Sequence, residues 1–141
     1  MVGILIISEN KQADEMLKTV KRLLGVVPGL KSLILPSEKS VESMEAHLCR
    51  ALKSFEKMKG VILLVDIYGS TQSNMCMKFV KKGSVGLLSG FNLPLLIKLG
   101  ALNKKNKKNK KVSLKTLLSF AESYGKDHLM HILDKKGPQK K

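Results

Sequence analysis

The sequence predicts one α/β domain of three layers, in which helices cover both faces of a mainly parallel sheet. Short apolar runs alternate with segments whose apolar residues have helical spacing, a pattern typical of parallel α/β folds. The run Gly60-Val-Ile-Leu-Leu-Val-Asp66 is continuously apolar, as expected of a central strand buried on both faces. With 141 residues and 43% hydrophobic content, the chain is long enough to build one core.

In the first half of the chain, turn residues and helix caps separate the predicted elements. Gly25 ends the first helical pattern, Pro36 ends the second strand, and Ser40 is a suitable N-cap for the helix that follows. The predicted elements are a strand over residues 2–7, a helix over 11–25, a strand over 31–35 and a helix over 40–55.

The second half repeats this alternation. We predict a strand over 60–66, a helix over 74–82, a strand over 84–88, a helix that starts near Asn92 with Pro94 in its first turn, and a helix over 113–125. Residues 128–133 have apolar side chains at both odd and even positions, so their pattern fits either a strand or a helix.

The net charge is +15, and much of it lies in two lysine-rich segments. Residues 103–111 contain six lysines, and a second cluster forms the tail over 135–141. Neither segment contains an arginine or an aromatic residue, so forked guanidinium contacts and base stacking are missing from both. We therefore predict an exposed Lys/Asn loop at 103–111 and a flexible basic tail at 135–141, and we do not favour nucleic acid as a partner.

Composition also bears on where the protein works. No apolar run reaches the roughly 18 residues needed to span a bilayer, and no basic stretch precedes the first apolar run. Cys49 and Cys76 lie in helix-like segments and have no metal-site spacing. These features predict a reduced cytoplasmic protein, without a transmembrane segment, a metal or a cofactor.

Polar residues follow the first and third predicted strands. Ser8, Glu9 and Asn10 end the first strand, and Asp66 with the turn after it ends the third. In parallel α/β sheets, ligands bind beyond the carboxyl ends of the strands. The sequence therefore predicts a site where these two strand ends meet.

Three segments together resemble the enzyme IIA domain of the mannose-type bacterial sugar phosphotransferase system. They are Met1-Val-Gly-Ile-Leu-Ile-Ile-Ser8, Val65-Asp-Ile-Tyr-Gly-Ser-Thr-Gln-Ser-Asn74 and Ser89-Gly-Phe-Asn-Leu-Pro94. The resemblance covers about residues 1–134, which we take as the domain. It implies an antiparallel C-terminal strand, often exchanged with a second subunit, and therefore a homodimer.

The resemblance also implies a phosphoryl-transfer site. The family's first strand ends in Ser/Thr-His-Gly, and its histidine accepts the phosphoryl group; Glu9 stands at that position here. Ser70 and Gln72 depart from the usual glycine and proline of the second loop. The candidate site residues are the acceptor-position Glu9 with Asp66, together with Ser8, Asn10, Gly69, Ser70, Thr71, Asn74 and Asn92.

The replacement of histidine leaves three interpretations of Glu9. It is a relic of a lost acceptor, a fixed negative charge that resembles the phosphorylated histidine, or an acceptor that forms an acyl phosphate. Asp66 either retains a role in the site or only caps turn amides. A hard cation held by Glu9, Asp66 and Thr71 is a less favoured alternative.

We predict a degenerate enzyme IIA-like protein that carries no phosphate and acts as a regulatory or protein-binding module. Its expected partners are the phosphocarrier protein, the IIB component or another regulated protein. The alternatives are an active phosphocarrier in sugar uptake and a basic nucleic-acid-associated protein. Because the acceptor histidine is absent, the sequence leaves open whether the chain is an enzyme.

Overall fold

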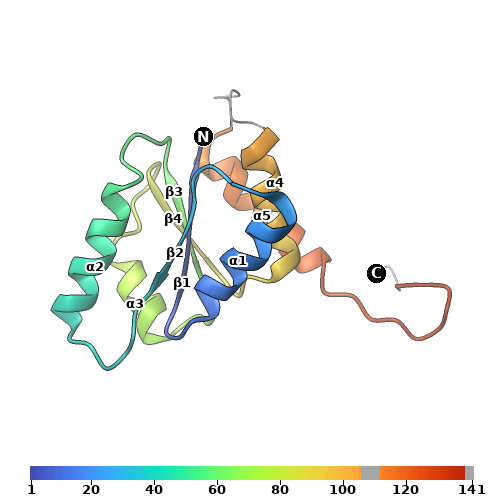
Figure 1. The fold of residues 1–141 in the computed structure, drawn as a ribbon, viewed down its shortest axis with the longest axis horizontal. Coiled ribbons are helices and arrows are strands. Elements are labelled where there is room, and N and C mark those ends of the chain that lie inside the picture. Colours follow the sequence, from blue (N-terminus) through green and yellow to red (C-terminus); the bar gives the residue numbers. More distant parts are fainter. Residues whose placement is uncertain (106–111, 139–141) are drawn as a thin grey trace.

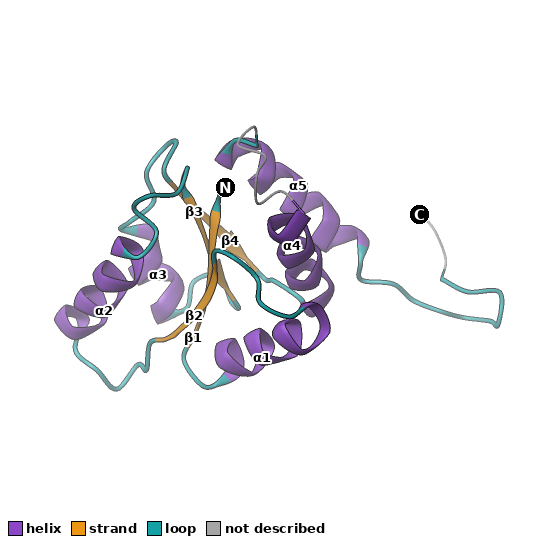
Figure 2. Cartoon of the chain, turned by 45° about the horizontal axis from the view of Figure 1, so that its top comes forward, coloured by secondary structure: helices purple, strands orange, loops and turns teal. Residues whose placement is uncertain are grey.

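The computed structural model describes residues 1–105 and 112–138, and within them helices and strands alternate along the chain (Figure 1). Figure 2 shows the helices on either side of a single sheet. The elements are β1 (Gly3–Ser8), α1 (Gln12–Leu24), β2 (Leu30–Ile34), α2 (Val41–Lys53), β3 (Val61–Val65), α3 (Thr71–Met77), β4 (Val85–Ser89), α4 (Leu93–Lys105) and α5 (Leu114–Asp127).

The sheet has the strand order β2-β1-β3-β4, and every pairing between these strands is parallel. In the register, Ile7 lies beside Val65, and Val65 lies beside Ser89. The predicted three-layer α/β fold is confirmed. Because all four strands run the same way, their carboxyl ends meet at one edge of the sheet and their amino ends at the other.

Alternate side chains of the two central strands enter two separate hydrophobic cores. Ile4 and Ile6 of β1 face the layer of α1, α4 and α5, whereas Leu5 and Ile7 face α2 and α3. Every residue of β1 and β3 is buried, as expected of strands covered on both faces.

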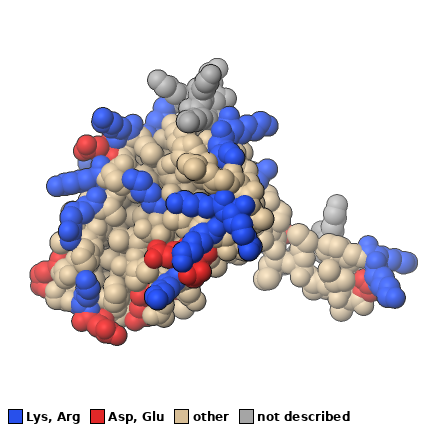
Figure 3. Space-filling view, in the orientation of Figure 1, with Lys and Arg blue, Asp and Glu red and all other residues tan. Residues whose placement is uncertain are grey.

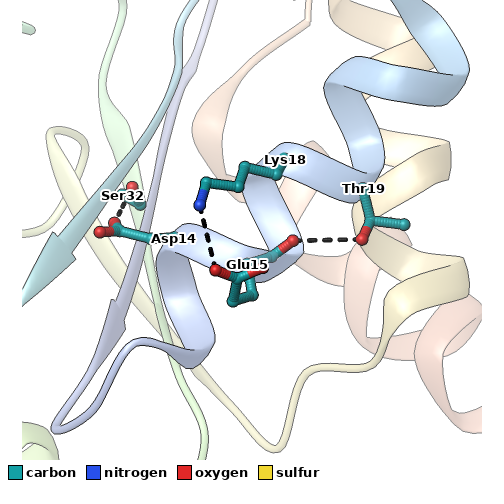
Figure 4. A network of polar contacts seen from close by, with 5 residues as sticks. All are labelled: Asp14, Glu15, Lys18, Thr19 and Ser32. Atoms are coloured by element: carbon teal, nitrogen blue, oxygen red, sulfur yellow. Dashed lines mark hydrogen bonds and ion pairs between the residues drawn. The ribbon is translucent and has the colours of Figure 1, made fainter.

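The first helix is tied to the sheet by a hydrogen bond between side chains. The Ser32 hydroxyl of β2 donates to Asp14 Oδ1 of α1 over 2.6 Å (Figure 4). On the exposed side of the same helix, Lys18 pairs with Glu15 at 3.1 Å. Gly25 ends α1 as predicted. Its φ of 77° lies in the left-handed region of backbone conformation, which glycine adopts more easily than other residues.

The predicted Lys/Asn loop starts too early, because α4 continues to Lys105. Asn103 is only 6% exposed, and its Nδ2 donates to the carbonyl oxygens of Val2 (3.2 Å) and Pro28 (3.1 Å). Asn103 therefore belongs to the core rather than to an exposed loop. The rest of the predicted loop, residues 106–111, lies outside the described residues, as does 139–141 of the predicted tail.

The antiparallel C-terminal strand is not formed within this single chain. After α5 ends at Asp127, the chain runs away from the body instead of turning back along β4 (Figure 1). Leu129 is 89% exposed and Leu133 is 81% exposed. Residues 129–133 form neither the strand nor the helix that the sequence pattern allowed.

We expect Asn103→Ala to lower the free energy of unfolding by about 1–3 kcal/mol, because two buried carbonyl groups lose their donor. Chemical denaturation followed by circular dichroism measures the change. Lys105→Ala is the matched control on the same turn, and as a surface change it should stay within about 0.5 kcal/mol. Equal stabilities of the two variants would contradict a structural role for the Asn103 amide.

Candidate functional site

The predicted site residues come from three loops at the carboxyl edge of the sheet. Since Ile7 lies beside Val65, the chain leaves β1 and β3 at neighbouring positions, through Ser8 and Asp66 respectively. The third loop follows β4 and lies next to the second, because the Gly90 amide donates to the Val65 carbonyl over 2.9 Å. The predicted convergence of the first two loops follows directly from this register.

Ser8 is fully buried and organises the turn between β1 and α1. Its hydroxyl donates to the Asn10 carbonyl (2.5 Å) and accepts from the Ala13 amide (2.9 Å) in the first turn of α1. The side chain of Lys11, at the N-cap position, makes no capping hydrogen bond. Ser8 therefore holds this turn, while Glu9 and Asn10 between the strand and the helix are exposed.

Asp66 is half-buried, and its Oδ1 accepts from the Ile67 amide over 2.9 Å. This contact agrees with the interpretation of Asp66 as a cap for a turn amide. Ile67 is 64% exposed and Tyr68 is 76% exposed, so two large side chains project from the rim of the site.

The third helix begins earlier than predicted, at Thr71 rather than Asn74. The reason is an N-cap that the sequence reasoning missed: the Ser70 hydroxyl accepts from the Ser73 amide over 3.1 Å. Ser73 is fully buried, and its hydroxyl accepts from the Gly69 amide at 3.4 Å. The Ser70-x-x-Ser73 spacing was the available signal. Thr71 and Asn74 lie in the first helical turn and are exposed.

Gln72 has a structural role that sequence reasoning did not assign. Its side chain is only 3% exposed, and Nε2 donates to the Leu35 carbonyl (2.8 Å) and the Ser37 hydroxyl (3.0 Å). The amide thereby joins the start of α3 to the loop after β2. The residue that departs from the family's usual proline is thus part of the scaffold under the site.

Asn92 caps the next helix rather than pointing freely into the site. Its Oδ1 accepts from the Leu95 amide (2.9 Å), and its Nδ2 donates to the Gly125 carbonyl of α5 (3.2 Å). The side chain thus joins α4 to α5 at the end of β4.

The histidines of the chain lie on other elements. His47 is within α2, and His131 is in the exposed segment after α5. His128 caps the end of α5, where its ring stacks on Tyr124 at 3.7 Å and its Nδ1 lies 2.7 Å from the Tyr124 carbonyl oxygen. The polar contacts at Ser8 and Asp66 are made with backbone groups and involve none of these rings.

Within residues 1–105 and 112–138, no three His, Cys, Asp or Glu side chains cluster as a metal site requires. In the same ranges, no helix has both the length and the apolar character needed to cross a bilayer.

The chain belongs to a bacterial phosphotransferase family. Residues 3–114 match the family model described as "PTS system fructose IIA component", which covers most of the domain and all three loops of the site. The resemblance seen in the sequence motifs is confirmed.

Known relatives agree with this assignment. The mannose-specific EIIAB component of Escherichia coli K12 is 26% identical over 98 residues, which are 69% of this chain and 30% of that protein. The chain thus matches less than a third of that relative's length. The mannose/sorbose specific IIA subunit of Enterococcus faecalis shares the fold with a TM-score of 0.76 at 18% identity, covering 93% of this chain and 94% of that one. A phosphotransferase EIIA component of Streptococcus agalactiae gives 0.75 at 17% identity, with 96% and 98% covered.

We expect Gln72→Leu to destabilise the domain by about 1–3 kcal/mol, because a buried carbonyl and a hydroxyl lose their donor. Thermal and denaturant unfolding measure the change. Asn74→Leu, two positions further along on the exposed face of the same short helix, is the control and should be close to neutral. If both variants match the parent chain, the Gln72 contacts contribute nothing to stability.

Proposed function

We propose that this chain is an enzyme IIA-like protein that carries no phosphoryl group and acts as a regulatory or protein-binding module of a phosphotransferase system. The observation that carries the proposal is Glu9, exposed at the end of β1, at the position where the resemblance implies an acceptor histidine. The proposal is supported by the loops around it, because the Ser8 turn and the Asp66 loop are held by hydrogen bonds to backbone groups and do not depend on position 9.

The chemistry of the two side chains differs in a decisive way. An imidazole nitrogen is a nucleophile near neutral pH, and its phosphoramidate transfers readily to the next carrier. A carboxylate would form an acyl phosphate instead, and a partner shaped to exchange a phosphoryl group with an imidazole does not match its geometry. Glu9 next to the Asp66 loop therefore gives the site a fixed negative charge, which resembles the charge of the phosphorylated state.

Such a module works by docking, and the rim of the site supports this role. The exposed Ile67 and Tyr68 offer apolar contact area beside the negative charge of Glu9. Exposed aromatic residues are common anchors of protein interfaces. The partners we infer are the phosphocarrier protein and the IIB component, which the family relationship implies.

A homodimer completes the proposal. The segment after α5 exposes Leu129, Met130, Ile132 and Leu133. The outer strand β4 has five residues, and beside its end lies a hollow of about 570 Å³ lined by Leu88, Gly90 and Leu129 among others. A strand added alongside the outermost strand of a sheet forms hydrogen bonds with its free backbone groups and buries alternate side chains. If two chains exchanged residues 129–133, each segment would bury its exposed apolar side chains and would also fill the hollow beside β4 of the other chain.

We expect no transfer of label from phosphoenolpyruvate to the wild-type chain in the presence of the phosphocarrier and its kinase, because the imidazole nucleophile is missing. Glu9→His should gain acid-labile label, since the scaffold of the site remains. Glu9→Gln is the control and should stay unlabelled.

Two results would contradict the proposal that the chain carries no phosphoryl group. Acid-labile label on a histidine of the wild-type chain would show an active carrier with another acceptor. Label that hydroxylamine releases, and that Glu9→Gln abolishes, would show an acyl phosphate on Glu9.

We expect Leu129→Ser combined with Leu133→Ser to shift the chain from dimer to monomer, because the exchanged segment loses its apolar contacts. Size-exclusion chromatography with light scattering measures the mass. Lys135→Ser with Lys136→Ser, two residues further on, should leave the dimer intact. A wild-type chain that is monomeric at every concentration tested would refute the exchange.

A further inference from the structure

The amino edge of the sheet, at the end opposite the candidate site, collects basic side chains. Backbone contacts define this end: the Lys59 amide donates to the Met1 carbonyl (3.0 Å), and the Val61 amide donates to the Ser84 carbonyl (2.9 Å). The buried Asn103 amide joins the end of α4 to Val2 and Pro28 at the same edge. The segments that enter the strands and the last turns of α1, α2 and α4 therefore share one face.

We call this surface the basic face. Figure 3 shows blue side chains predominating in the upper part of the body, around the N-terminus, while most red side chains lie lower down. In the segments concerned, Glu56 is the single acidic residue. The exposed members of the basic face are Lys21, Arg22, Arg50, Lys53, Lys57, Lys59, Lys81, Lys82, Lys104 and Lys105.

Helix stability accounts for only part of this charge. Basic residues in the last turns of α1, α2 and α4 complement the negative ends of the helix dipoles. Lys104 has a clear structural role, since its Nζ donates to the Leu24 carbonyl at the end of α1. The loop residues Lys57 and Lys59 and the pair Lys81 and Lys82 cap no helix, and in the described chain the ion pairs involve Lys18 and Lys126 instead.

We propose that the basic face binds the surface of a membrane that contains anionic lipids. Clustered lysines are attracted to the negative potential of anionic headgroups, and the attraction grows with each lysine near the surface. The chain has 24 lysines and 2 arginines among its 26 basic residues. The arginines, Arg22 and Arg50, lie in the last turns of α1 and α2, and the other members of the basic face are lysines. Compact ammonium groups suit diffuse attraction to many headgroups rather than forked recognition of one phosphate.

Two exposed apolar residues decide between a lipid surface and a nucleic acid. Val26 is 85% exposed and Leu23 is 56% exposed. Leu23 follows Arg22 directly, and Val26 follows it four residues later, just beyond the end of α1. Apolar tips flanked by basic residues can enter the boundary between headgroups and acyl chains, where burial of their surface strengthens binding. A nucleic-acid backbone offers only phosphates and sugars to this surface and would leave both tips in water.

This arrangement also fits the geometry of the site. With the amino edge of the sheet on a membrane, the carboxyl edge with Glu9 and Asp66 points away from the bilayer. The candidate site would remain open to partners from solution. The inference does not rest on the proposed function, because it concerns the opposite end of the molecule.

The test measures co-sedimentation of the full chain with vesicles of phosphatidylcholine with and without phosphatidylglycerol, at physiological salt. The first variant combines Lys21→Gln, Lys57→Gln, Lys59→Gln and Lys105→Gln. Its matched control removes the same charge elsewhere, with Lys39→Gln, Lys126→Gln, Lys135→Gln and Lys136→Gln. A second pair compares Val26→Ser with Val41→Ser, which is exposed at the start of α2 near the other edge.

We expect binding only to vesicles that contain phosphatidylglycerol. The first variant should bind at least about tenfold more weakly, and the charge-matched control should bind nearly as the wild type does. Val26→Ser should weaken binding measurably, and Val41→Ser should not. All variants change exposed side chains, and unchanged thermal midpoints confirm that each is folded.

Three outcomes overturn the proposal. The first is an absence of binding to the anionic vesicles. The second is an equal loss in the charge-matched control, which would mean that net charge rather than this face attracts the lipid. The third is tighter binding to a duplex DNA probe at the same salt, unaffected by Val26→Ser, which would identify the face as a nucleic-acid surface.

Discussion

Burial of β1 and β3 on both faces is the constraint on which the rest of the structure depends. Because neither strand has a solvated side, the chain must cross over the sheet between strands and cover it with helices on both faces. Parallel strands then place all their carboxyl ends at one edge. Polar and charged residues have nowhere to lie but the two edges and the outer faces of the helices. The separation of the candidate site from the basic face follows from this single requirement.

The sequence was sufficient for the elements whose signal is local. The apolar run before Asp66 predicts a buried strand without reference to any other residue, and Gly25 and Ser40 mark helix ends by their own backbone and hydroxyl chemistry. The convergence of Ser8 and Asp66 followed as well, because parallel pairing forces neighbouring strand ends together.

Three features of the structure could not be predicted from the sequence. Asn103 lies in a lysine-rich run, and its burial depends on carbonyls some 75 and 101 residues away in sequence. Gln72 depends on Leu35 in the same manner. The path after α5 could not be predicted because the apolar pattern of residues 128–133 fits a strand and a helix equally well.

The site and the basic face divide the molecule into two ends with different chemistry. At the carboxyl edge, backbone groups hold Ser8 and Asp66 in place, and the exposed Glu9, Ile67 and Tyr68 are available to a protein partner. At the amino edge, lysines from four separate segments form a broad charged surface with two apolar tips. The proposed docking role uses the first end, and the proposed membrane contact uses the second. A module with two independent surfaces can hold its position with one and exchange partners with the other.

The turn after β1 has a wider consequence for how this fold can change over time. The buried Ser8 hydroxyl alone provides the contacts with Asn10 and Ala13 that shape the turn, so the neighbouring position 9 is not required for folding. A histidine, a glutamate or a glutamine there should leave the domain equally stable. Selection can therefore alter the reactivity of this fold one residue at a time, without first having to repair its architecture. A carrier can lose its chemistry in a single mutational step and persist as a well-folded protein on which a new role can be built.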